Sequence, residues 1–377
     1  MSTTMTRVQR PTPQHGLHRL HRLHRQTELD RQTELDRQTE LDVQSSLRRP
    51  NPAVESRARY SPFPLGHDPR TFGLTTSAMR LAHGVVVVRH GRRTAGDTAT
   101  ILLHGAAGSW TTWTPLLTAA EATMTSSGLR EADASGLPLT DLIIPDLPGW
   151  GDSALPGDPA DRTVEVLAAT VAEIARALGY RRWIVVGHSM GGFVALELAA
   201  AAPEATARVE LISPTTFAVI DSVRHPLTRF TTLPAYTALL LVMRLLARLG
   251  RLGRALISGV SRLPLLRVAV SPLFARPDDI EAGIIRALAG EVRPLGFAVA
   301  SARAGAYPAG ERWSRILCPV RTLTGESDVF VAATDADRLR GVIRRFEAVT
   351  VGGVGHFAHI ERPFTVLDTL RSPCSTQ

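Results

Sequence analysis

The chain has 377 residues, of which 44% are hydrophobic and 21% charged, a composition typical of a globular enzyme rather than of a disordered or fibrous protein. Its formal net charge of +8 rests on arginine alone, because the sequence contains no lysine, and no segment interleaves basic and aromatic residues as nucleic-acid-binding modules do. Cys318 and Cys374 belong to no C-x-x-C or Cys/His cluster, which excludes an obvious zinc site or disulfide framework.

The first 75 residues lack the pattern of a folded domain. The sequence Gln-Thr-Glu-Leu-Asp begins at Gln26 and recurs at Gln32 and Gln38. A six-residue period suits neither an α-helix nor a heptad, so residues 1–75 are predicted to form a disordered tail. Met79, at the first convincing strand, is an alternative start of translation. Because the N-terminus has no apolar signal segment, we expect a cytoplasmic protein.

From Met79 onward, short apolar runs alternate with helix-like stretches. Strands are predicted at 79–82, 85–90, 99–103, 142–144, 183–186, 209–212, 320–323 and 346–351, and helices at 163–178 and 191–202. This alternation predicts an α/β fold with a mostly parallel eight-stranded sheet and helices on both faces. Residues 76–212 and 314–377 would form this core, with the active site beyond the carboxyl ends of the strands.

Residues 213–313 separate the sixth and seventh strands and are predicted to form a helical cap, since structureless loops of that length are uncommon. Arg244, Arg248 and Arg251 recur there at helical spacing among leucines, although Gly250 should interrupt a continuous helix. The charges are too frequent for a membrane-spanning helix. Two interpretations stay open: the leucines pack over the substrate pocket while the arginines meet water, or the helix contacts an anionic membrane surface.

The strongest local signal is the sequence G-H-S-M-G-G at 187–192, which follows a predicted strand and precedes a predicted helix. In that context the pattern is typical of a sharp turn that presents a nucleophilic serine at a helix N-terminus. Side chains in place of Gly187 and Gly191 would collide with the neighbouring elements. We therefore predict Ser189 as the nucleophile, with an ordinary glycine-rich turn as the alternative.

A serine hydroxyl needs a base to remove its proton, and His356 lies in a loop after the last predicted strand. His359 is the alternative, although it is expected to begin the following helix. The imidazole in turn needs a carboxylate that fixes its tautomer. Asp328, which follows the seventh strand, is the best placed, and Glu326 is the alternative.

Hydrogen-bond donors must also stabilise the oxygen that becomes negative during acyl transfer. We predict the backbone N–H groups of Met190, next to the nucleophile, and of Ala106, in the sequence H-G-A-A-G at 104–108. A phosphate-binding loop is the alternative for 104–108, but the Gly-Lys-Ser/Thr ending is missing. No cofactor and no metal ion are expected.

Five motifs in this order resemble the α/β-hydrolase superfamily, in its serine-nucleophile branch of esterases and lipases. They are I-L-L-H-G-A-A-G-S-W at 101–110, D-L-P-G-W-G-D-S at 146–153, G-H-S-M-G-G at 187–192, G-E-S-D at 325–328 and G-H-F-A-H-I-E-R-P at 355–363. The resemblance implies no catalytic role for His188 and a structural role for Asp152. Dehalogenases and epoxide hydrolases of similar pattern carry aspartate in place of Ser189, which argues against those activities.

The sequence thus predicts a serine hydrolase that cleaves a carboxylic ester of a hydrophobic small molecule through an acyl-enzyme, without a nucleic-acid partner. A carbon–carbon bond hydrolase, an acyltransferase or a cofactor-free peroxidase could use the same three residues. A ligand-binding receptor on a hydrolase scaffold is the alternative from another class, although such proteins often lose one of the three residues.

Overall fold

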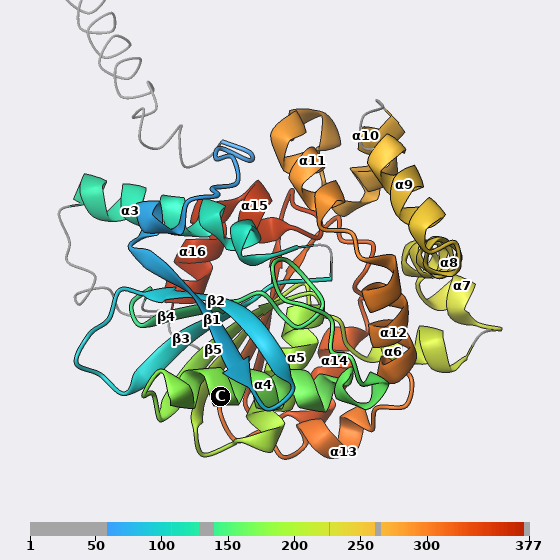
Figure 1. Cartoon of the computed structure of the whole chain (residues 1–377). Coiled ribbons are helices and arrows are strands. Elements are labelled where there is room, and N and C mark those ends of the chain that lie inside the picture. The colour runs from blue at the N-terminus through green and yellow to red at the C-terminus, as the bar shows by residue number, and fades with distance from the viewer. Residues whose placement is uncertain (1–58, 107, 128–138, 226, 261–264, 373–377) are drawn as a thin grey trace, which may run out of the picture. The chain divides into compact units, whose positions relative to one another are not determined.

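The computed structural model describes residues 59–372 apart from 107, 128–138, 226 and 261–264. One sheet contains β1 (Leu74–Leu81), β2 (Gly84–Gly91), β3 (Thr98–Leu103), β4 (Leu142–Pro145), β5 (Arg182–His188), β6 (Thr206–Ile212), β7 (Val320–Gly325) and β8 (Phe346–Val351). Its order is β1-β2-β4-β3-β5-β6-β7-β8. β2 is antiparallel to both its neighbours, and the other pairs are parallel (Figure 1). The predicted sheet is confirmed, although β1 begins at Leu74 rather than at Met79.

The apolar runs in the central strands arise because both faces of the sheet are covered. Ile101 and Leu103 of β3 pack in a core with α4 (Val164–Ala177) and α5 (Met190–Ala201). Leu102, between them, points to the opposite core with α3 (Thr114–Ser127) and α16 (Pro363–Arg371). Successive side chains of a strand point to opposite faces, so a strand covered on both sides carries an uninterrupted apolar run. Figure 1 shows the two helix layers on either side of the strands.

Between β6 and β7, the described residues form mostly helices. It contains α6 (Phe217–Arg224), α7 (Arg229–Thr232), α8 (Pro234–Arg248), α9 (Arg251–Val260), α10 (Leu265–Val270), α11 (Ala282–Gly290), α12 (Pro294–Ala304) and α13 (Ala309–Trp313). Gly250, with a φ of +55°, separates α8 from α9, so the expected interruption is present. Within the described ranges, no helix combines the length and the apolar character needed to cross a bilayer.

Shorter elements complete the fold. They are the 3₁₀ helices η1 (Pro69–Phe72), η2 (Trp110–Trp113), η4 (Pro159–Asp161), η5 (Ser271–Leu273) and η6 (Pro277–Asp279), and the helices α14 (Asp335–Val342) and α15 (Ala358–Glu361). The loops after β3, β5, β7 and β8 follow the carboxyl ends of neighbouring parallel strands. Residues that are distant in the sequence therefore meet along this edge.

The predicted tail boundary at residue 75 is wrong. Tyr60, Leu65 and Phe72 are buried in the core, and the Ser61 N–H donates to the Glu361 carbonyl oxygen at 2.7 Å. Tyr60 and Leu65 belong to one apolar cluster with Phe274 and Phe357, and Phe72 belongs to the core that contains α3 and α16. The repeats that suggested a tail lie outside the described residues.

Candidate active site

Ser189 stands at the junction of β5 and α5 with φ of 51° and ψ of −118°, a backbone conformation that is strained for a residue with a Cβ. The turn also requires close backbone contact. A Cβ on Gly187 would lie 2.4 Å from the Gly191 carbonyl oxygen, and one on Gly191 would lie 2.1 Å from the Leu103 carbonyl oxygen. Only glycine fits at both positions, and the turn places Ser189 at the positive end of the α5 dipole.

The structure brings the three side chains predicted for catalysis into one hydrogen-bonded chain. His356 Nε2 lies 3.0 Å from Ser189 Oγ, and His356 Nδ1 lies 3.0 Å from Asp328 Oδ2. An ionised carboxylate only accepts hydrogen bonds, so Nδ1 carries the proton. The Nε2 lone pair is then directed at the serine hydroxyl, which is the arrangement that a general base needs.

The surroundings of Asp328 favour its charged form. Its side chain is fully buried, and burial by itself would raise the pKa of this carboxyl group. The neighbouring His356 and the hydrogen bonds that it donates act in the opposite direction, as does the Phe330 N–H at 2.8 Å. The net result is a lowered pKa of Asp328, so the group that orients the imidazole is anionic at neutral pH.

The two alternative residues occupy different surroundings. Glu326 is exposed, and its carboxylate accepts the Gly353 N–H at 3.2 Å. The His359 ring is buried against Trp113 and His188, with ring centroids 4.7 and 4.6 Å away. Burial and then the nearby His356 lower the pKa of His359 to about 3. His359 is therefore a neutral packing residue, and its ring nitrogens have no hydrogen-bond partner among the described residues.

Glu361 holds the loop that carries His356, a role that the sequence analysis did not identify. Its carboxylate accepts the N–H groups of Gly355 at 2.9 Å and of Phe357 at 3.2 Å, the residues on either side of His356. It also accepts the Ala275 N–H at 2.9 Å. One buried carboxylate therefore ties the histidine loop to the segment that follows η5.

Tyr60, from the N-terminal part of the chain, also binds the Glu361 carboxylate. Its hydroxyl donates to Glu361 Oε2 at 2.5 Å and accepts the Arg276 N–H at 2.9 Å. Burial and then the charge of Glu361 raise the pKa of Tyr60, so the hydroxyl keeps the proton that it donates. The appearance of Tyr60, Phe63 and Leu65 after the polar repeats was the available sequence signal.

We expect Tyr60→Phe in the full chain to lower kcat by roughly 3- to 10-fold with little change in KM, because small displacements of a catalytic group are costly. The free energy of unfolding should fall by about 1.5–3 kcal/mol, as for a hydrogen bond to a charged group. Tyr180→Phe is the matched control. It removes the hydrogen bond to Asp141, 3.0 Å long, at the amino ends of the strands.

The control variant should lose stability but keep kcat. An unchanged kcat in Tyr60→Phe, or an equal loss of kcat in both variants, would show that Tyr60 has only a structural role. Thermal unfolding and steady-state kinetics on a soluble ester provide both readouts.

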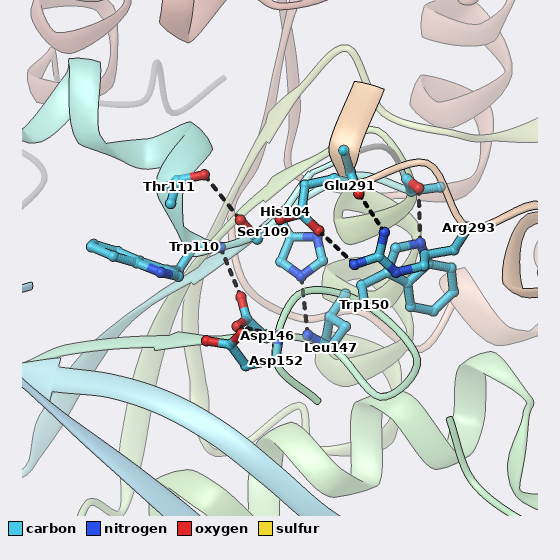
Figure 2. Close-up of polar contacts among 12 residues, drawn as sticks. His104, Ser109, Trp110, Thr111, Asp146, Leu147, Trp150, Asp152, Glu291 and Arg293 are labelled. Atoms are coloured by element: carbon cyan, nitrogen blue, oxygen red, sulfur yellow. Dashed lines mark hydrogen bonds and ion pairs between the residues drawn. The ribbon is translucent and has the colours of Figure 1, made fainter. Parts of the chain in front are cut away.

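Residues 104–106, after β3, lie next to the turn that carries Ser189 and are held by contacts with the loop after β4. His104 Nε2 accepts the Leu147 N–H at 3.0 Å, so Nδ1 carries the proton and donates to the Gly105 carbonyl oxygen at 2.8 Å. Burial lowers the pKa of His104, which keeps the ring neutral. Trp150 Nε1 donates to the Ala106 carbonyl oxygen at 2.8 Å. Figure 2 shows the bond between the His104 ring and Leu147, with Trp150 nearby.

Asp146 and Asp152 stabilise the same region. Asp146 accepts the Trp110 N–H at 2.9 Å, a bond drawn in Figure 2, and pairs with Arg89 at 2.5 Å. Arg89 also pairs with Asp152, which gives this residue a structural contact. His188, at the end of β5, contacts the loop of His356 instead, because its Nε2–H donates to the His356 carbonyl oxygen at 2.9 Å.

A cavity of about 110 Å³ lies between the core and the helices that follow β6, and Ser189 and His356 form part of its wall. The two predicted donors, Ala106 and Met190, also line it. The wall is mostly apolar and includes Val164, Leu167, Phe193, Val219, Leu239, Leu273, Phe297, Phe330 and Phe357. Tyr236 adds a hydroxyl, which donates to Ser301 Oγ at 2.9 Å. Burial raises the pKa of Tyr236 to about 12, so its hydroxyl is uncharged at neutral pH.

Comparison with known proteins agrees with this architecture. The model of the alpha/beta hydrolase family matches residues 100–369. The dihydrolipoyllysine-residue acetyltransferase component of the acetoin cleaving system of Cupriavidus necator is 33% identical over 133 residues. That match covers 34% of this chain and only 30% of the relative, so the chain spans less than a third of that protein.

Solved structures share the fold at low sequence identity. The epoxide hydrolase CorEH is 20% identical with a TM-score of 0.57, and the match covers 78% of this chain and 96% of the other. A thermophilic esterase from Thermogutta terrifontis is 17% identical with a TM-score of 0.53, over 79% of this chain and 96% of the other. At such identities the likeness supports the fold alone. The family match extends over most of the chain and includes all five motifs, and the chain therefore belongs to the alpha/beta hydrolase family.

Proposed function

We propose that this protein hydrolyses carboxylic esters of hydrophobic small molecules, with Ser189 as nucleophile, His356 as general base and Asp328 as the orienting acid. The observation that carries the proposal is the hydrogen-bonded chain of these three side chains, in which Ser189 and His356 line a mostly apolar cavity. Epoxide hydrolysis by the aspartate mechanism is disfavoured, because the nucleophile position holds a serine.

In the acylation step, Ser189 Oγ attacks the ester carbonyl carbon while His356 Nε2 takes the hydroxyl proton. Asp328 stabilises the imidazolium that forms. The backbone N–H groups of Ala106 and Met190 would stabilise the oxyanion, and within the described part of the chain neither donates to a protein acceptor. Collapse of the tetrahedral intermediate breaks the bond to the alcohol oxygen, which receives the proton from His356.

Deacylation repeats these steps with water. His356 removes a proton from the attacking water, the second tetrahedral intermediate forms, and the serine oxygen leaves with the proton returned by the imidazolium. The products are the carboxylic acid, the alcohol and the free enzyme. No oxidation or reduction occurs in these reaction steps.

The lining of the cavity supports an apolar acyl or alcohol group. Each buried methylene contributes about 0.8 kcal/mol, which corresponds to roughly a fourfold increase in kcat/KM while the cavity still has room. We expect kcat/KM for p-nitrophenyl esters to rise with acyl length and then to fall once the chain exceeds the cavity. A flat profile would argue against an apolar acyl site.

A fluorophosphonate probe tests the mechanism directly. An active serine hydrolase should form a stable adduct on the peptide that contains Ser189, and mass spectrometry identifies the labelled residue. A ligand-binding protein with an inactive site would not be labelled. Adding an alcohol acceptor to the ester assay distinguishes hydrolysis from acyl transfer, because a transferase would release a new ester instead of the acid.

A further inference from the structure

Exposed apolar side chains are concentrated on α7 to α10. Among the described residues, thirteen large apolar side chains are exposed, and nine of them lie between Leu227 and Val268. The name cap surface is used here for one group on α8, α9 and the turn between them, namely Val242, Leu245, Arg248, Leu249, Arg251, Leu252 and Leu256. Leu245 and Leu252 are 58% and 59% exposed. Exposed apolar side chains that gather on one part of a fold are typical of interaction sites.

This exposure contradicts the interpretation that the leucines at 241, 245, 249 and 252 pack over the pocket. α8 buries Tyr236, Leu240 and Met243 instead, at a spacing of one helical face. Tyr236 and the adjacent Leu239 line the cavity from that face. Arg248 therefore shares the outward side of the helix with the exposed Leu241 and Leu245. In Figure 1, α8 and α9 lie at the margin of the molecule farthest from β1 and β2.

The segment that bears the cap surface carries charge of one sign. Between Asp221 and Asp278 the sequence contains nine arginines and no aspartate or glutamate. Arg248 and Arg251 are exposed, Arg244 is half-buried, and none of the three has an acidic group within ion-pair distance in the described part of the chain. Uncompensated arginines beside exposed leucines fit a partner that is both apolar and anionic.

We propose that the cap surface binds an anionic lipid bilayer peripherally. The leucines would enter the boundary between headgroups and acyl chains while the arginines meet lipid phosphates. A second copy of this chain fits less well, because a symmetric contact would place arginines against arginines with no acidic residue to pair with them. The inner face of α8 borders the cavity, so the bound bilayer would lie one helix away from Ser189.

The test is cosedimentation of the full protein with vesicles of phosphatidylcholine alone or mixed with phosphatidylglycerol. Binding should require the anionic lipid and weaken as NaCl rises from about 0.05 to about 0.5 M, because salt screens exposed charges. The variant Arg244→Gln/Arg248→Gln/Arg251→Gln should bind on the order of 100-fold more weakly, at about 1 kcal/mol per arginine. Leu245→Ser/Leu252→Ser should also bind more weakly.

The matched control is Arg181→Gln/Arg344→Gln/Arg345→Gln, which removes the same charge from exposed positions before β5 and β8, at the amino ends of the strands. It should bind like the wild type, and all variants should hydrolyse a soluble short-chain ester at the wild-type rate. Equal losses in the two arginine variants, absence of wild-type binding at low salt, or a dimer that Leu245→Ser/Leu252→Ser dissociates would overturn the proposal. Vesicle binding is measured without catalysis, so the membrane proposal can be tested even if the protein does not hydrolyse esters.

Discussion

Replacing Ser189 by alanine should reduce ester turnover by on the order of 10⁴-fold or more while the protein stays folded. The hydroxyl supplies the attacking oxygen, and its removal leaves only the polarising effect of the backbone donors around the cavity. Ser222→Ala is a matched control, because Ser222 is a buried serine whose hydroxyl donates to the Ala218 carbonyl oxygen in α6. It should keep wild-type kcat.

His356→Ala should cause a loss of similar size, and the double variant with Ser189→Ala should be scarcely worse than either single variant. The two side chains act as one unit, joined by the 3.0 Å hydrogen bond, so removing the second adds little. Circular dichroism verifies folding, and single-turnover kinetics measure the acylation rate. Turnover near the wild-type level in Ser189→Ala would reject the serine mechanism.

Asp328→Asn should lower kcat on the order of 10⁴-fold with a much smaller change in KM. The amide can donate a hydrogen bond to Nδ1, which stabilises the tautomer with the proton on Nε2. That tautomer cannot accept the proton from Ser189. Glu326→Gln is the control, because Glu326 is exposed and bonded to Gly353, and it should keep most of the activity.

The same variant has a signature in stability. The pKa of Asp328 is lower in the folded protein than in the unfolded chain, so its charge stabilises the fold above the unfolded-state pKa. This contribution disappears as the pH falls through the folded-state pKa. The difference in unfolding free energy that arises from this charge should therefore shrink at acid pH, as urea titrations at several pH values can measure. For catalysis, equal losses of kcat in Asp328→Asn and Glu326→Gln would contradict the assignment of Asp328 as the acid that orients His356.

Local sequence patterns determined the sheet and the nucleophile turn. Runs such as Ile101 to Leu103 predict strands covered on both faces, and the structure places their alternate side chains in two separate cores. The glycines around Ser189 are needed because the backbone itself leaves no room for a Cβ. These features depend on neighbours along the chain or on backbone geometry, so the sequence is sufficient to predict them.

Tertiary structure was needed wherever the answer depended on which way a side chain points. His356 and His359 lie three residues apart, yet one contacts Ser189 and Asp328 while the other packs against Trp113. Loop direction decides between them, and contacts from distant elements fix that direction. The bond between Tyr60 and Glu361 joins residues 301 positions apart, and no local pattern encodes it.

In the helices between β6 and β7, too, the direction of the side chains depends on tertiary packing. α8 carries apolar residues around most of its circumference, so periodicity alone cannot identify the buried face. Its buried side is the one that meets α12 and lines the cavity, and the leucines beside Arg248 remain exposed. The sequence by itself determined how strands and helices follow one another along the chain, the strained serine turn and the set of candidate residues. Only the packing of distant elements decided which histidine meets Ser189, which acid meets that histidine, where the N-terminal boundary lies, and which apolar face stays open.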